Sequence, residues 1–175
     1  MRLLKVLDLN PNIADKIIDW IDRNTIPTNP ELFDSENSSK NAPLDSIDEI
    51  LLIPGIERTQ YDTLLPYITV YGDGRVNINT AETPVLMSLS DSISRDMAER
   101  IVTYRKIEPF KEWADIYQVS GFTLEIVGPF QTYMKTRGTA FRVISTAASG
   151  GVKKVIDCVL EISGGSNIVR YWREI

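Results

Sequence analysis

Three stretches of alternating apolar and polar residues end the chain, and this pattern limits the fold more than any other feature. In the middle stretch the apolar residues Ile156, Cys158 and Leu160 occupy alternate positions, as expected for a strand with one buried face. Pairs of adjacent glycines at 150–151 and 164–165 separate the stretches. We therefore predict an antiparallel meander with strands over 139–147, 152–162 and 167–174.

The part of the chain before residue 135 has helical periodicity instead. Ile13, Ile17 and Ile21 recur at helical spacing and predict an amphipathic helix over 13–23. The stretch 24–43, rich in proline and asparagine, predicts a long surface loop. Two short helices and one short strand are expected to follow, over 45–52, 57–65 and 67–71.

The segment that follows has the helix, tight turn and helix pattern of helix-hairpin-helix units. Helices are predicted over 81–89, 94–105 and 112–119. Thr80 is the expected N-cap of the first of them, and Asn77 and Asn79 are expected to cap the turn before it. Phe110 and Trp113 are expected to close the small core.

Together these patterns predict an α+β fold. Residues 1–134 form a helical domain of helix-hairpin-helix (SAM-like) units, and residues 135–175 form the three-stranded meander. A sheet of three strands has an apolar face to bury, and the helices do not clearly supply a cover for it. We therefore expect a further segment N-terminal to Met1 in the natural protein.

The composition removes several classes of active site. The 175 residues include no histidine and one cysteine, which excludes Ser-His-Asp and Cys-His catalysis, histidine-ligated metals and an intramolecular disulfide. Asp19 and Asp22 could act as paired carboxylates, but no nucleophile or oxyanion donor accompanies them. We expect no catalytic residue, no enzymatic activity and, for Cys158, a role as a small buried hydrophobe.

Charge is distributed unevenly along the chain, whose net charge is −5. Residues 1–70 hold 6 basic and 12 acidic residues, 71–134 hold 6 and 9, and 135–175 hold 7 and 3. Nucleic-acid binding, as in other helix-hairpin-helix proteins, is the alternative function. It would need a basic surface, and the turn at 89–94 has no glycine and places Asp91 where a phosphate would lie. We predict no nucleic-acid partner.

Oxygen donors gather around the first helix and the loop after it. Three aspartates share one helix face, and two carboxylates and an amide lie in the loop: Asp15, Asp19, Asp22, Asp34, Glu36 and Asn41. Ca²⁺ takes six to eight oxygen ligands in flexible geometry and suits such a set. A solvated acidic helix face would show the same pattern.

Several segments in order resemble the K-type minor pseudopilin family of type II secretion systems. They are 17–22 with Asp19-Trp20-Ile21-Asp22, 41–56 with Asn41-Ala42-Pro43-Leu44, 65–70, 76–81, 98–105, Pro109-Phe110 and 171–174. The resemblance implies a helical domain inserted into a pilin-like αβ domain, of which the meander is the remainder. The missing cover would then be an N-terminal hydrophobic helix that is absent from this chain.

The resemblance also implies a function without catalysis. Family members cap the tip of the pseudopilus and initiate its assembly together with the I- and J-type minor pseudopilins. The secreted substrate and the outer-membrane secretin are further candidate partners. The implied location is the periplasm, with the full-length protein anchored in the bacterial inner membrane before assembly and membrane contact made only through the absent helix.

A calcium site near the first helix is part of the same resemblance. Asp19 and Asp22 match the family pattern, and Asp34 and Glu36 are the candidate ligands from the loop. Arg23 departs from the pattern and places a positive charge where a dication would lie. No other cofactor is expected.

Overall fold

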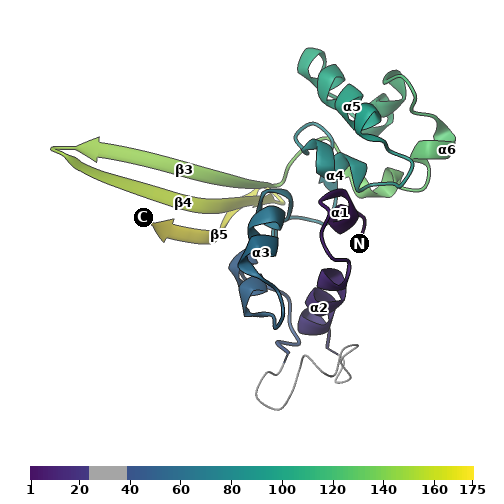
Figure 1. Ribbon diagram of the computed structural model, residues 1–175. Helices are drawn as coiled ribbons and strands as arrows, with labels where there is room; N and C mark the ends of the chain where they lie inside the picture. Colours follow the sequence, from purple (N-terminus) through teal and green to yellow (C-terminus); the bar gives the residue numbers. More distant parts are fainter. Residues whose placement is uncertain (24–38) are drawn as a thin grey trace.

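The computed structural model describes residues 1–23 and 39–175, which form two helical units and a three-stranded sheet. The three strands of the sheet extend away from one side of the helical part (Figure 1). This arrangement confirms the predicted α+β class with an antiparallel meander at the end of the chain. None of the helices in the described residues has the length and apolar character needed to cross a bilayer.

The first helical unit comprises residues 1–23 and 39–71. Its elements are α1 (Arg2–Val6), α2 (Asn12–Ile21), the 3₁₀ helix η1 (Ile47–Leu52), α3 (Arg58–Leu64) and the 3₁₀ helix η2 (Leu65–Tyr67). Its core is a cluster of buried side chains from α1, α2, η1, α3 and the segment between η1 and α3: Leu4, Ile13, Ile50, Ile53, Ile56, Tyr61 and Leu64. The predicted first helix is confirmed, although it ends before Asp22, where the backbone becomes extended.

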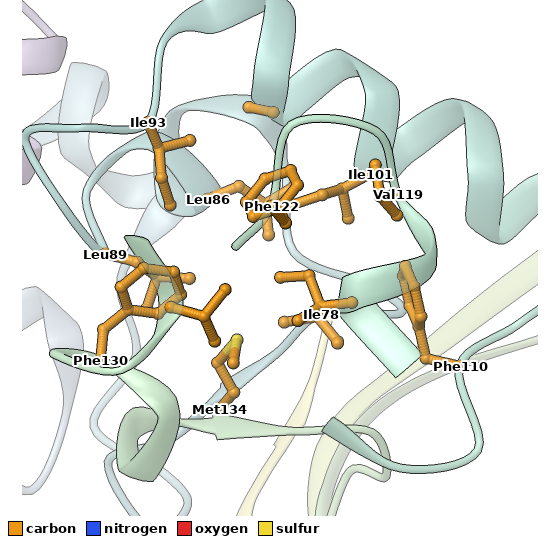
Figure 2. Close-up of a cluster of buried hydrophobic side chains, with 13 residues drawn as sticks. Ile78, Leu86, Leu89, Ile93, Ile101, Phe110, Val119, Phe122, Phe130 and Met134 are labelled. Atoms are coloured by element: carbon orange, nitrogen blue, oxygen red, sulfur yellow. The ribbon is translucent and has the colours of Figure 1, made fainter. Parts of the chain in front are cut away.

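The second helical unit runs from residue 76 to residue 135. Its elements are β1 (Val76–Asn77), α4 (Thr83–Met87), α5 (Arg95–Ile107), η3 (Trp113–Gln118), α6 (Leu124–Val127), η4 (Gln131–Tyr133) and β2 (Met134–Lys135). β1 and β2 pair in parallel and bring the two ends of the unit together. Figure 2 shows Ile78, Leu86, Phe122 and Phe130 among the side chains that make up its separate core.

One short motif occurs in both helical units. In η1 and in η3 the third residue of the helix is acidic and accepts hydrogen bonds from the two backbone amides before the helix. Glu49 accepts from residues 45 and 46, at 2.9 and 3.1 Å, and Asp115 from residues 111 and 112, at 2.7 and 3.0 Å. Each helix is followed by a glycine with positive φ, Gly55 at 70° and Gly121 at 93°, and an apolar core residue. The two cores are therefore built on the same local device.

The strand predicted over 67–71 is wrong. Pro66 lies in the first turn of η2, where its fixed φ favours a helical turn, and Tyr71 N then donates to Thr69 Oγ1 at 3.1 Å. This side-chain turn bends the backbone. Residues 68–71 consequently form neither helix nor strand.

Two further details of the second unit differ from prediction. α4 has Glu82 as its N-cap instead of Thr80, because the amides of Thr80 and Ala81 already bond to Asn77 O in the preceding turn. Asn77 Oδ1 accepts from Asn79 N at 3.0 Å, as predicted. Phe110 is buried, whereas Trp113 is 37% exposed and contacts Tyr117 edge to face.

The sheet has the order β3-β4-β5, with β3 (Ala140–Ser149), β4 (Val152–Ser163) and β5 (Ser166–Glu174). Both pairings are antiparallel, and the glycine pairs 150–151 and 164–165 form the two turns. A bulge between Val159 and Leu160 shifts the register against β5. The predicted division into residues 1–134 and 135–175 stays a prediction.

Candidate protein-binding site

One face of the sheet is apolar and remains largely uncovered. Val143, Cys158 and Trp172 stand opposite one another across the three strands, and so do Phe141, Leu160 and Val169. Side chains on paired residues lie on the same side of a sheet, so these six form one continuous surface, which we call the outer apolar face. Val143 and Trp172 are 39% and 58% exposed, and Phe141 and Val169 are exposed as well.

The opposite face of the sheet holds the two buried residues of β4. Asp157 and Val159 alternate with Cys158 and Leu160 along β4, and both are buried. The buried residues of β4 therefore lie on the face opposite to the predicted one. Cys158, which was expected to be buried, is half-buried. Trp172 is exposed, because the helical units do not cover the face on which it lies.

An exposed apolar surface of this kind is uncommon on a water-soluble domain. Patches that combine large aliphatic and aromatic side chains mark protein-binding or membrane-binding sites. The outer apolar face spans all three strands and contains a tryptophan, the residue type that contributes most at protein interfaces. The outer apolar face can therefore bind another polypeptide that presents an apolar helix or sheet of matching shape.

The turns that could hold a phosphate are occupied by basic side chains from the same unit or its neighbour. Asp91, in the turn at 89–94, pairs with Arg2 at 3.1 Å and lies 3.9 Å from Lys5, and Arg2 Nη1 also donates to Leu89 O at 3.3 Å. A second glycine-containing turn lies between η1 and α3, and there Lys16 Nζ donates to Gly55 O at 2.5 Å. α1 and α2 thus cover both turns, and a phosphate would have to displace these contacts and meet the Asp91 carboxylate.

The candidate calcium ligands are only partly within the described residues. Asp19 is 3% exposed in the last turn of α2, Asp22 is the C-cap of that helix, and Asn41 N donates to Trp20 O at 2.9 Å. Three hard-oxygen side chains therefore lie at one end of α2, which fits part of a calcium shell but supplies fewer than six ligands. Asp34 and Glu36 lie outside the described residues. Within 1–23 and 39–175, no three acidic or sulfur side chains group closely enough to hold a metal.

Comparison with known proteins gives one consistent family. Two family models, both described as type II secretion system (T2SS), protein K, match residues 1–73 and 76–134. They meet between the two helical units, at the point where one core ends and the other begins. Together they span most of the chain.

A curated protein and a solved structure agree with this match. The chain is 28% identical over 138 residues to the type II secretion system protein K of Dickeya chrysanthemi, covering 70% of this chain and 37% of that protein. The chain therefore spans little more than a third of the length of that relative. A chain in the crystal structure of the GspK-GspI-GspJ complex from enterotoxigenic Escherichia coli superposes with a TM-score of 0.76 at 16% identity, over 99% of this chain and 68% of that one. At this identity the superposition shows the fold.

Proposed function

Because this chain belongs to the protein K family of type II secretion systems, we propose that it acts as a minor pseudopilin that caps the tip of the pseudopilus and initiates its assembly. In this role the function resides in surfaces that bind other subunits, and no chemical step is required of any residue. The absence of histidine from the sequence supports this view, since it removes the usual proton carrier at neutral pH.

The outer apolar face is the observation that carries the proposal. An antiparallel sheet of three strands is stable only when one apolar face is packed, and here the helical units leave that face open. We propose that an N-terminal pilin-like helix and the I- and J-type minor pseudopilins cover it. Support comes from the relative with the same fold, which was crystallised as a complex with GspI and GspJ.

The place of action follows from the same proposal. A subunit of the pseudopilus tip works in the periplasm, and the full-length protein would be held in the inner membrane by the N-terminal helix before assembly. The secreted substrate and the outer-membrane secretin are the partners that a tip subunit would meet next.

The test is co-purification of the chain with the I- and J-type proteins of the same secretion system. Val143→Asp and Ile144→Asp form a matched pair, since the two residues are adjacent in β3, both exposed, and on opposite faces of the sheet. We expect Val143→Asp to weaken the complex at least tenfold and Ile144→Asp to leave it within about twofold, because burying an unpaired carboxylate is costly only inside the interface.

A second arm addresses the alternative of nucleic-acid binding. Labelled duplex DNA is titrated at about 50 mM salt, where a phosphate-binding protein binds far more tightly than at physiological salt. Tight, salt-dependent binding of DNA together with failure to form the three-protein complex would overturn the proposed function.

A further inference from the structure

A polar and aromatic cleft lies where the base of the sheet meets the first helical unit. It encloses about 400 Å³. One wall comes from η1, α3 and residues 68–71. The other comes from β3, β4 and β5, where every lining residue except Phe141 lies on the face opposite the outer apolar face. We call it the junction cleft. In Figure 1, α3 lies beside the base of the strands that form its other wall.

An ion pair between an exposed arginine and a buried aspartate fixes the sheet wall of the junction cleft. Arg142 donates from Nε and Nη2 to the two carboxylate oxygens of Asp157, at 2.9 and 2.8 Å. The Asp157 side chain is 3% exposed, while that of Arg142 is 64% exposed. The two-pronged contact holds the guanidinium in one orientation and leaves its outer edge accessible from the cleft.

Arg173 also lines the cleft, and its guanidinium N–H donors are available to a ligand. Its Nη2 lies 3.8 Å from Asp157 Oδ2, too far for a hydrogen bond, whereas Arg142 donates to both oxygens of that carboxylate. Within residues 1–23 and 39–175, the Arg173 guanidinium makes no hydrogen bond, and its side chain is 54% exposed. A guanidinium carries five N–H donors, so Arg173 can bind a carboxylate in two-pronged fashion without breaking a native contact.

Aromatic and apolar side chains make up much of the remaining lining, with Asp48 and Arg58 as the charged residues of the helical wall. Tyr71 and Tyr171 are half-buried in it, and burial together with the nearby Tyr171 and Asp157 raises the pKa of the Tyr71 hydroxyl. On the helical wall Asp48 accepts a hydrogen bond from the Tyr61 hydroxyl. The Asp48 carboxylate would repel an anion there, so an anionic group is directed to the Arg142 and Arg173 side.

Overall charge favours the same kind of ligand. Residues 135–175, which form the sheet wall, hold 7 basic and 3 acidic residues, whereas residues 1–134 are acidic. We propose that the junction cleft binds an extended acidic and apolar segment of a partner protein, with a side-chain carboxylate on Arg173 and Arg142 and an apolar side chain against Tyr71 and Tyr171. This site goes beyond the proposed tip role, since it lies on the other face of the sheet and its partner can differ from the I- and J-type subunits.

The test uses isotope-labelled chain and two short peptides followed by NMR. The peptides have blocked ends and the sequences Ser-Leu-Glu-Phe-Ser and Ser-Leu-Gln-Phe-Ser, and they differ only in the carboxylate. We expect the glutamate peptide at millimolar concentration to shift the amides of 68–71 and 171–173, and to bind at least threefold more tightly than the glutamine peptide. Arg173→Gln should abolish that preference. Arg170→Gln is the matched control, because Arg170 lies in the same strand, pairs with Glu161 at 2.5 Å and does not line the cleft.

Several results would overturn the proposal. They are equal binding of the two peptides, shifts confined to other residues, or no shift at all up to about 10 mM peptide. If acetate alone produces the same shifts, the cleft is a simple anion site. If the shifts appear when the chain is concentrated without peptide, the occupant is a second copy of the chain. None of these results depends on the I- and J-type proteins, so failure here and failure of the proposed function are separately observable.

Discussion

The side-chain amide of Asn79 pairs with the backbone of Phe110 as a strand residue would. Phe110 N donates to Asn79 Oδ1 at 2.9 Å, and Asn79 Nδ2 donates back to Phe110 O at 2.8 Å. The same Nδ2 also donates to Thr136 O at 3.0 Å. One asparagine thereby joins three segments of the second helical unit: the turn before α4, the loop after α5 and the end of β2.

Replacing Asn79 by alanine should therefore destabilise the second unit. The change leaves an amide and two carbonyls that are partly buried without partners, and each such group costs about 1 kcal/mol or more. We expect a loss of about 2–4 kcal/mol in the free energy of unfolding, measured by urea denaturation. Asn167→Ala is the control, since Asn167 is exposed on β5, and it should change stability by less than about 0.5 kcal/mol. Equal effects of the two changes would show that the Asn79 bonds contribute nothing.

The repeated motif of η1 and η3 gives a second prediction. Asp115 accepts the amides of Lys111 and Glu112, and these backbone hydrogen bonds lower the pKa of its carboxyl group. Asp115→Ala should cost about 1–2 kcal/mol, as for loss of a helix cap. Glu125→Ala removes an acidic residue from the first turn of α6 and has no comparable contact, so it should cost a few tenths of a kcal/mol. Thermal unfolding followed by circular dichroism separates the two, and a cost for Asp115→Ala no larger than for Glu125→Ala would contradict the shared role of the motif.

This motif could have been found from the sequence. Ile50, Ile53, Gly55 and Ile56 have the same spacing as Ile116, Val119, Gly121 and Phe122, with the N-cap four residues before the first member in both cases. Helical periodicity within each segment predicts single helices and does not reveal a spacing that two units share. Both members are 3₁₀ helices with little apolar periodicity of their own, which weakens the usual signal.

Elements with a strong period were predicted well, and elements fixed by side-chain contacts were not. The three strands and the helix of Asn12–Ile21 follow from alternation and from helical spacing. The strand over 67–71 failed because the Thr69 hydroxyl competes for the Tyr71 amide, a local contact that alternation does not encode. The exposure of Trp172 depends on which face of the sheet the helical units cover, and the residue pattern of a strand does not contain that information.

The Asp73 carboxylate gives a prediction of pH dependence. The ammonium of Lys135, by a hydrogen bond of 2.6 Å, and next the guanidinium of Arg75 hold the pKa of Asp73 well below its usual range. A carboxyl group whose pKa is lowered by folding adds stability above its unfolded pKa of about 3.9, and this stability is lost as the pH falls through the folded pKa. We expect Asp73→Asn to cost about 1 kcal/mol from pH 5 to 8, a figure kept small because the side chain is one third exposed.

The stability difference between the unchanged protein and Asp73→Asn should shrink steadily below about pH 4. There the unfolded chain binds a proton at Asp73 that the folded protein does not. Urea denaturation of both proteins at pH 7, 5, 4 and 3 measures it. Asp62→Asn serves as control, because its pair with Arg58 is exposed on α3 and should contribute less than about 0.5 kcal/mol at any of these pH values. A stability difference for Asp73→Asn that grows on acidification would have the wrong sign for this ion pair.

The last prediction concerns calcium at the end of α2, where we propose that Asp19 and Asp22 contribute ligands. A ligand that binds the folded protein alone stabilises it by about 2.7 kcal/mol at a hundred times its dissociation constant. Adding Ca²⁺ to protein freed of metal by chelation should therefore raise the melting temperature by several degrees, and Mg²⁺ should do so less because it demands stricter octahedral geometry.

Asp19→Asn should abolish this calcium-dependent increase, whatever it does to the stability of the metal-free protein, because Asp19 is the buried carboxylate of the pair. Asp62→Asn, far from α2 in the sequence, should leave the increase unchanged. The readout is thus the difference between melting temperatures with and without calcium, which a purely structural role of Asp19 would not affect. A melting temperature that stays the same after chelation and after addition of Ca²⁺ would leave the acidic end of α2 as a solvated helix terminus.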